Sequence, residues 1–126
     1  MNLLDSSCWL EYFADGPNAQ VFRKPIEDTR NLLVPTTAVL EVFKRTLQQR
    51  DEEASLRAVA QMEQGGIVDP DSPIALSAAR IGCERKPPLA DSVILATALA
   101  HDATLWTQDS RFESMEKVRY LPGRTS

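Results

Sequence analysis

Three aspartates stand where predicted elements of an α/β protein begin or end. Asp5 follows the short apolar run 2–4, Asp109 follows the β-prone run 104–107, and Asp91 lies at the start of an apolar helical segment. If these carboxylates share one pocket, their like charges repel strongly unless a cation lies between them. Ligands that are all oxygen atoms favour Mg²⁺ or Mn²⁺, and such an ion retains water and accepts phosphate oxygens as further ligands. The spacing therefore favours metal-dependent phosphodiester chemistry.

The two strand-end aspartates also have ordinary structural explanations. Asp5 can cap the helix that follows it, as aspartate often does at a strand-to-helix turn. Asp109 precedes Ser110 and Glu113, which have the spacing of a capping box, so Asp109 can be a turn residue only. Neither residue alone decides between a metal site and local turn chemistry.

Asp91 and Glu41 differ in what surrounds them along their helices. One and two turns after Asp91, the same face carries Ile94, Leu95 and Ala98. Partial burial is therefore expected for Asp91, and a metal ligand fits this better than a charge at the helix N-terminus. On a helical wheel Glu41 shares its side with Arg45 and lies opposite a mainly apolar stripe of Val39, Val42, Phe43 and Thr46. The wheel predicts that Glu41 is exposed and ion-paired.

The elements that must position these residues alternate between strand and helix. Strands are expected at 2–4, 32–34, 67–68, 104–107 and 118–121. Helices are expected from Asp5 to the stop at 15–17, and over 18–30, 36–47, 51–64, 72–85 and 89–100. Thr36 or Thr37 is a suitable cap for the third helix, Ser72 with Pro73 for the fifth, and Pro25 is expected to kink or split the second.

This alternation predicts one α/β domain over residues 1–126, with a mostly parallel central sheet of about four to five strands flanked by helices. In such sheets binding sites form beyond the carboxyl ends of the strands. Asp5 and Asp109 both fall there, which is the first indication of function.

Composition sets outer limits on the class of protein. The chain has 126 residues, 43% of them hydrophobic and 25% charged, as in an ordinary globular domain. No apolar run reaches the roughly 20 residues of a membrane span, and Met1 leads directly into Asn2 without a basic stretch or cleavage site, so a cytoplasmic protein is expected. The net charge of -4 is unlike a dedicated nucleic-acid binder, yet it suits a nuclease that gathers carboxylates around cations.

Cysteine and histidine offer no rival site. Cys8 and Cys83 are far apart in sequence and are expected to be reduced core thiols. The single histidine, His101, ends an apolar helix, where it can interact with the helix dipole. Hydrolysis by a Ser-His-Asp or Cys-His triad is therefore not expected.

Three motifs match one family in order and spacing. They are LLDSSCWLEYF at 3–13, LADSVILATA at 89–98 and LWTQDSRF at 105–112. With these motifs the chain resembles PIN-domain proteins, and specifically their VapC-like toxins. The segment TTAVLEV at 36–42 resembles the family's second motif, which assigns Glu41 to the site despite the helical wheel.

The resemblance implies a metal-dependent ribonuclease that acts as the toxin of a toxin–antitoxin pair. Asp5, Glu41, Asp91 and Asp109 would then be catalytic, the three aspartates would hold Mg²⁺ or Mn²⁺, and Ser6 and Thr107 would support them. An activated water would attack the phosphate in line, leaving 5′-phosphate and 3′-hydroxyl ends. The resemblance also implies a homodimer and an antitoxin whose C-terminal segment covers the cleft.

Two basic pairs are candidates to guide an RNA backbone: Lys44 with Arg45, one turn beyond Glu41, and Arg85 with Lys86. For any one of them, ordinary surface charge is the favoured explanation.

Two other functions are open. A phosphatase that forms an aspartyl phosphate, like the haloacid dehalogenases, also begins with an aspartate after its first strand. It requires a second aspartate two residues later, where this chain has Ser7, and no well-placed lysine follows the late strands. A non-catalytic PIN-like binding module would be expected to lack two or more of the acids, and all four are present.

Overall fold

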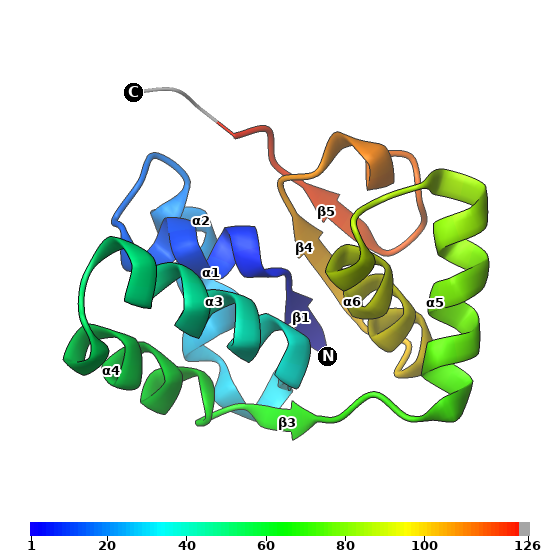
Figure 1. Ribbon diagram of the computed structural model, residues 1–126. Helices are drawn as coiled ribbons and strands as arrows, with labels where there is room; N and C mark the ends of the chain where they lie inside the picture. Colours follow the sequence, from blue (N-terminus) through cyan, green and yellow to red (C-terminus); the bar gives the residue numbers. More distant parts are fainter. Residues whose placement is uncertain (124–126) are drawn as a thin grey trace.

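The structure, a computed structural model, describes residues 1–123. Five parallel strands form one sheet in the order β3-β2-β1-β4-β5 (Figure 1). The strands are β1 (Asn2–Leu4), β2 (Leu32–Pro35), β3 (Gly66–Val68), β4 (Thr104–Thr107) and β5 (Val118–Tyr120). The predicted parallel α/β sheet is confirmed. Its central strand, β1, pairs with β2 on one side and with β4 on the other, in a register that sets Leu4 beside Trp106.

Six α-helices occur within residues 1–123: α1 (Ser6–Phe13), α2 (Ala19–Glu27), α3 (Thr36–Gln49), α4 (Glu52–Met62), α5 (Ser72–Arg85) and α6 (Leu89–Ala100). Two short 3₁₀ turns, η1 (Thr29–Asn31) and η2 (Ser110–Phe112), precede β2 and follow β4. The helices pack as the pairs α1 with α2, α3 with α4 and α5 with α6, and α3 also contacts α1 and α6. Helix α3 therefore stands between the two elements that carry Asp5 and Asp91.

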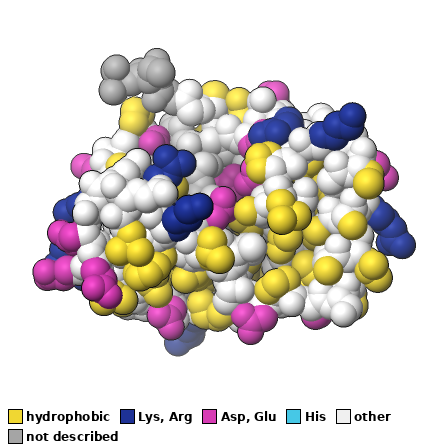
Figure 2. Space-filling view, in the orientation of Figure 1, with side chains coloured by type: hydrophobic (Ala, Val, Ile, Leu, Met, Phe, Trp, Pro, Cys, Tyr) yellow, Lys and Arg dark blue, Asp and Glu magenta, His cyan; other side chains and the backbone are white. Residues whose placement is uncertain are grey.

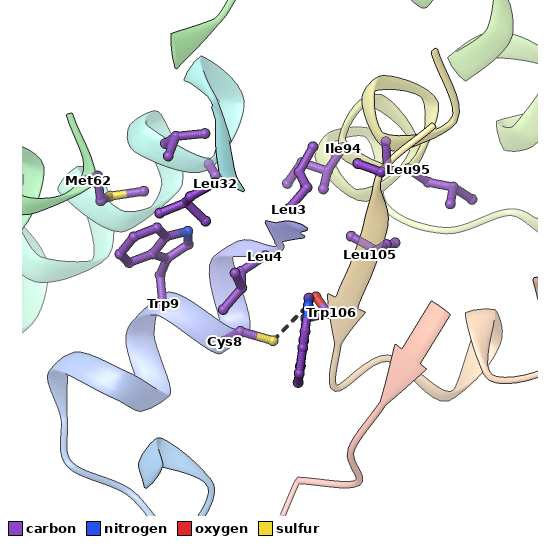
Figure 3. Packing of buried hydrophobic residues seen from close by; sticks show 14 of the residues in the cluster. Leu3, Leu4, Cys8, Trp9, Leu32, Met62, Ile94, Leu95, Leu105 and Trp106 are labelled. Carbon is purple, nitrogen blue, oxygen red and sulfur yellow. Dashed lines mark hydrogen bonds between the residues drawn. The ribbon is translucent and has the colours of Figure 1, made fainter. Parts of the chain in front are cut away.

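Buried apolar side chains cover both faces of the sheet. Leu3 and Leu4 are both fully buried, although neighbouring residues of a strand point to opposite faces. Figure 3 shows Leu3 beside Ile94 and Leu95 of α6, whereas Leu4 lies near Cys8 and Trp106. Trp9, fully buried on α1, lies beside Leu32 and Met62 (Figure 3). The core thus fixes α1 and α6 against β1, and these elements carry two of the predicted site residues.

The helix caps differ from the sequence-based expectations. The N-cap of α3 is Pro35 without a side-chain bond, and Thr36 is already helical, so the predicted threonine cap is wrong. The cap of α5 is Asp71, whose carboxylate accepts from the Ile74 amide at 3.0 Å, and Ser72 is the first helical residue. The Asp71 carboxylate therefore caps α5 in place of the predicted Ser72 hydroxyl.

Three other local expectations are corrected. Pro25 lies inside α2 without splitting it, although its missing amide hydrogen costs the helix one backbone hydrogen bond, and α2 ends two residues later at Glu27. The final strand ends at Tyr120 rather than at residue 121. Cys8 is buried as predicted, but Cys83 is exposed on α5, so the prediction of two core thiols holds for only one of them.

Among residues 1–123, no helix combines the length and the apolar character needed to cross a membrane.

Candidate active site

The four predicted acids come from four elements that meet at the carboxyl edge of the sheet. Asp5 directly follows β1, Asp109 follows its neighbour β4, Glu41 lies on α3, and Asp91 lies in the first turn of α6. Figure 2 shows acidic side chains in a hollow at the middle of this face, with basic side chains on both sides of it. Adjacent parallel strands ending at one edge are what bring distant parts of the chain together here.

Asp5 is held rigidly below the surface. Its residue is only 5% exposed, yet its carboxylate accepts three hydrogen bonds. Oδ1 accepts from the Ser7 hydroxyl at 2.6 Å and from the Cys8 amide at 3.0 Å, and Oδ2 accepts from the Thr107 hydroxyl at 2.5 Å. Asp5 therefore caps α1, as its ordinary explanation predicted, and is also oriented from β4.

Thr107 links Asp5 to Asp109. Its fully buried hydroxyl donates to Asp5 and accepts from the Asp109 amide at 2.9 Å. One hydroxyl can do both because it carries a donor and two acceptor lone pairs. Thr107 at the end of β4 thus ties the Asp5 carboxylate to the backbone of Asp109.

The two oxygens of Asp109 have different surroundings. Oδ1 caps η2 by accepting from the Arg111 amide at 2.9 Å, and it pairs with the Arg111 guanidinium through Nε at 3.0 Å. Oδ2 is buried and has no hydrogen-bond partner within residues 1–123. Asp109 therefore has the turn role that its ordinary structural explanation predicted. The cap of η2 is Asp109 itself and not Ser110. Its second oxygen, Oδ2, is therefore available to another partner. A buried carboxylate oxygen that has no partner destabilises the fold.

Glu41 is not the solvated residue that the helical wheel predicted. It is half-buried and accepts a hydrogen bond from the Ser6 hydroxyl at 2.9 Å. The wheel failed because α3 is covered on two sides. Ala38 and Val42 face the core, whereas Glu41 lies on a side that contacts α1, where Ser6 donates to it. The assignment from the resemblance placed this residue better than the pattern did.

The other three predicted acids all raise the pKa of Asp91. Its half-buried carboxyl has a pKa raised to about 6, chiefly by burial, then by the negative charges of Asp5, Glu41 and Asp109, with Arg111 acting in the opposite sense. Repulsion of this kind favours a proton or a cation in the hollow. The carboxylate cluster therefore has unbalanced negative charge that a bound proton or cation would neutralise.

The donor set suits a hydrated hard cation rather than a closed metal cage. Within residues 1–123, no three side chains of Asp, Glu, His or Cys are close enough together to enclose an ion. Mg²⁺ keeps several water ligands and is usually bound through one or two carboxylates, so a loose group of carboxylates fits it. The unpartnered Oδ2 of Asp109 and the repelled carboxyl of Asp91 are the atoms best suited to it.

The four predicted basic residues are all exposed, and they fall on two sides of the site. Lys44 and Arg45 continue α3 beyond Glu41. Arg85 ends α5 and donates from Nη1 to the Arg111 carbonyl at 3.4 Å, and Lys86 is the left-handed cap of that helix. Their proposed role with RNA stays a prediction.

Sequence reasoning missed Ser7 and Arg111. Both stand two residues after a predicted acid, and both hydrogen-bond the carboxylate of that acid. A polar residue at this short spacing after an aspartate is a signal that could have found them.

Cys8 in the same turn is excluded as a nucleophile or metal ligand, because burial and the negative charge of Asp5 raise the pKa of its thiol well above its usual value.

The sequence matches the family model described as the PIN domain over residues 3–118. The chain belongs to the PIN-domain family. A comparison of its sequence with curated proteins finds no significant match.

Several solved structures share this PIN fold. The toxin–antitoxin complex from Klebsiella pneumoniae has a chain with a TM-score of 0.78 at 21% identity, covering 94% of this chain and 96% of that one. VapC20 from Mycobacterium tuberculosis, a toxin that cleaves the sarcin-ricin loop, has a TM-score of 0.76 at 10% identity, with 92% and 95% covered. FitAcB from Neisseria gonorrhoeae has a TM-score of 0.71 at 24% identity, with 97% and 98% covered. The fold of the PIN domain described here is therefore that of VapC-type toxins.

Proposed function

We propose that this chain is a metal-dependent endoribonuclease and the toxin of a toxin–antitoxin pair. The observation that carries the proposal is the arrangement around Asp91, whose carboxyl is repelled by three other acids from separate elements. A fold does not need such a cluster for stability, because like charges brought together destabilise it. The VapC-type fold, and the cleavage of the sarcin-ricin loop by VapC20, support RNA as the substrate.

Asp5, Asp91 and Asp109 would hold Mg²⁺ or Mn²⁺ partly through its water ligands, because no three carboxylates among the described residues are close enough to enclose an ion, and Glu41 would complete the catalytic group. When bound, the ion would lower the pKa of the attacking water and neutralise charge on the scissile phosphate. The chain's own residues supply rigidity. Ser7 and Thr107 fix Asp5, Ser6 orients Glu41, and Arg111 leaves one oxygen of Asp109 free. Such fixed orientation spares the reorganisation that a flexible site would need during the reaction.

The purified protein is expected to cleave RNA in Mg²⁺ or Mn²⁺ and to lose all activity in excess EDTA, because no described histidine or cysteine offers another route. Total bacterial RNA should be the substrate, and sequencing of the new ends should show 5′-phosphates. Restoring activity by adding Mn²⁺ back controls for damage by the chelator. Undiminished cleavage in EDTA by protein free of contaminating nuclease would rule out the metal mechanism.

We also propose an antitoxin partner and a homodimer. Complexes with antitoxin occur among the structural neighbours, and a free nuclease would harm its host. Expression from the native operon is expected to yield a complex in which a small protein inhibits cleavage stoichiometrically. Light scattering then gives the number of copies of each chain. Recovery of fully active protein without a partner from that operon would argue against the toxin assignment.

The two rival functions make different predictions. In an aspartyl-phosphate phosphatase the residue two positions after Asp5 must be free to transfer protons, but here the Ser7 hydroxyl is bonded to Asp5 itself. A non-catalytic PIN module would bind RNA and leave it intact in every divalent ion. The cleavage assay separates that module from the nuclease.

A further inference from the structure

Arg111 is a cation at the edge of an otherwise acidic site. Its guanidinium pairs with Asp109 through Nε at 3.0 Å, while its side chain stays 46% exposed. Within residues 1–123 this is the sole hydrogen bond from its guanidinium, so both terminal nitrogens remain available. The backbone amide of the same residue donates to the same oxygen, so the Asp109 carboxylate is held where the Arg111 guanidinium can pair with it.

This anchoring gives the guanidinium a defined direction. A planar guanidinium presents five N–H donors, and the edge formed by its two terminal nitrogens matches two oxygens of a phosphate. Because Nε is used internally, that edge is the part left for a ligand. The other oxygen of Asp109 is buried and has no hydrogen-bond partner among the described residues, so the free edge of Arg111 and one expected metal ligand, Asp109, lie on one short turn.

We propose that Arg111 binds a phosphate of the RNA chain and positions it against the carboxylate cluster. The inference rests on the proposed nuclease function and names the residue that recognises its substrate. Arg85, whose Nη1 donates to the Arg111 carbonyl, places a second guanidinium on the same turn, suited to a neighbouring phosphate. Acidic sites repel polyanions, and an arginine fixed at the edge offsets that repulsion without filling the space needed by the metal.

Kinetics with total bacterial RNA in Mg²⁺ test the proposal. Arg111→Ala is expected to lower kcat/KM about 10- to 100-fold, mainly through a higher KM, because a charge-assisted bidentate contact is lost. Arg111→Lys keeps the charge and loses the planar fork, so it should recover only part of the activity. Arg23→Ala removes a comparably exposed, ion-paired arginine of α2 and should stay within about twofold of wild type.

A binding measurement separates substrate contact from a purely structural role. Asp91→Asn protein, which should leave RNA intact, is titrated with a fluorescein-labelled single-stranded RNA of mixed sequence at several salt concentrations. Introducing Arg111→Ala into the Asp91→Asn protein is expected to reduce the magnitude of the slope of log affinity against log salt concentration by about 0.7, the value for one lost phosphate contact. Adding Arg111→Lys should lower affinity and leave the slope unchanged. Thermal melts of all variants check that the fold is intact.

Unchanged slope and kcat/KM in Arg111→Ala, or full activity in Arg111→Lys, would overturn the role of Arg111 even if wild type cleaves RNA. If wild type binds RNA without cleaving it, and Arg111→Ala still flattens the slope, then the nuclease proposal fails and the phosphate contact stands.

Discussion

Replacing Asp91 with asparagine is expected to abolish RNA cleavage and, in the absence of divalent ions, to make the fold more stable. The carboxyl of Asp91 has a pKa of about 6 in the folded protein, against roughly 3.9 for an unperturbed aspartate. Between these values the folded protein holds a proton that the unfolded chain has released. The free energy of unfolding of wild type therefore falls as pH rises from about 4 to about 6, and it stays lowered above that.

Asparagine removes this penalty, so the two proteins should be equally stable near pH 4 and differ most above pH 6. After allowance for the partial exposure of Asp91, the difference at pH 7 is on the order of 1 to 2 kcal/mol. With Mg²⁺ at about ten times its dissociation constant, wild type should regain ~1.4 kcal/mol, whereas the variant should gain little. Thermal melts with and without Mg²⁺ measure both effects. Equal gains from Mg²⁺ in the two proteins, or wild-type cleavage by the variant, would exclude Asp91 as a ligand.

Asp5→Ala is expected to cause the largest loss of stability among the site variants and to abolish cleavage. Alanine removes the cap of α1 and leaves the Cys8 amide and two hydroxyls without their acceptor in a buried place. A lost cap costs about 1 kcal/mol, and unsatisfied buried donors bring the total to about 2 to 4 kcal/mol, less a small gain from relieved repulsion with Asp91.

Asp5→Asn is the matched control, because its amide keeps the shape and one acceptor oxygen. It should be equally inactive and yet lose only about half as much stability, since most of the cap survives. Urea unfolding at pH 7 compares the three proteins. Equal stability of Asp5→Ala and wild type would mean that the three hydrogen bonds to Asp5 do not constrain the native state.

The parallel sheet and the convergence of strand-end acids follow from local pattern. Short apolar runs that alternate with helical periods predict parallel strands, and Asp5 and Asp109 lie at strand ends whichever helices cover the sheet. Asp91 was also correctly expected to be partly buried, because its helix is apolar around most of its circumference. The family model and the shared fold confirm the resemblance to PIN-domain proteins, whereas the roles of the site residues remain predictions.

Glu41 shows what pattern cannot supply. A helical wheel reports which side of a helix is apolar, but it does not report that α1 packs beside the polar side. The partner of Glu41, Ser6, is 35 residues away, and no periodicity connects them.

The position of β1 at the centre of the sheet also governs when the site can form. Residues 2–4 are made about a hundred residues before residues 104–106, their pairing partners on one side, so the chain must close a loop of that length before Thr107 can reach Asp5. Pairings this distant in sequence slow folding and leave early strands without their neighbours. During synthesis, the emerging chain carries Asp5 and Glu41 long before it carries Asp109. If the proposed nuclease function is correct, a partly translated chain lacks the complete acidic site, and cleavage of RNA can begin only after the segment that bears β4 has left the ribosome.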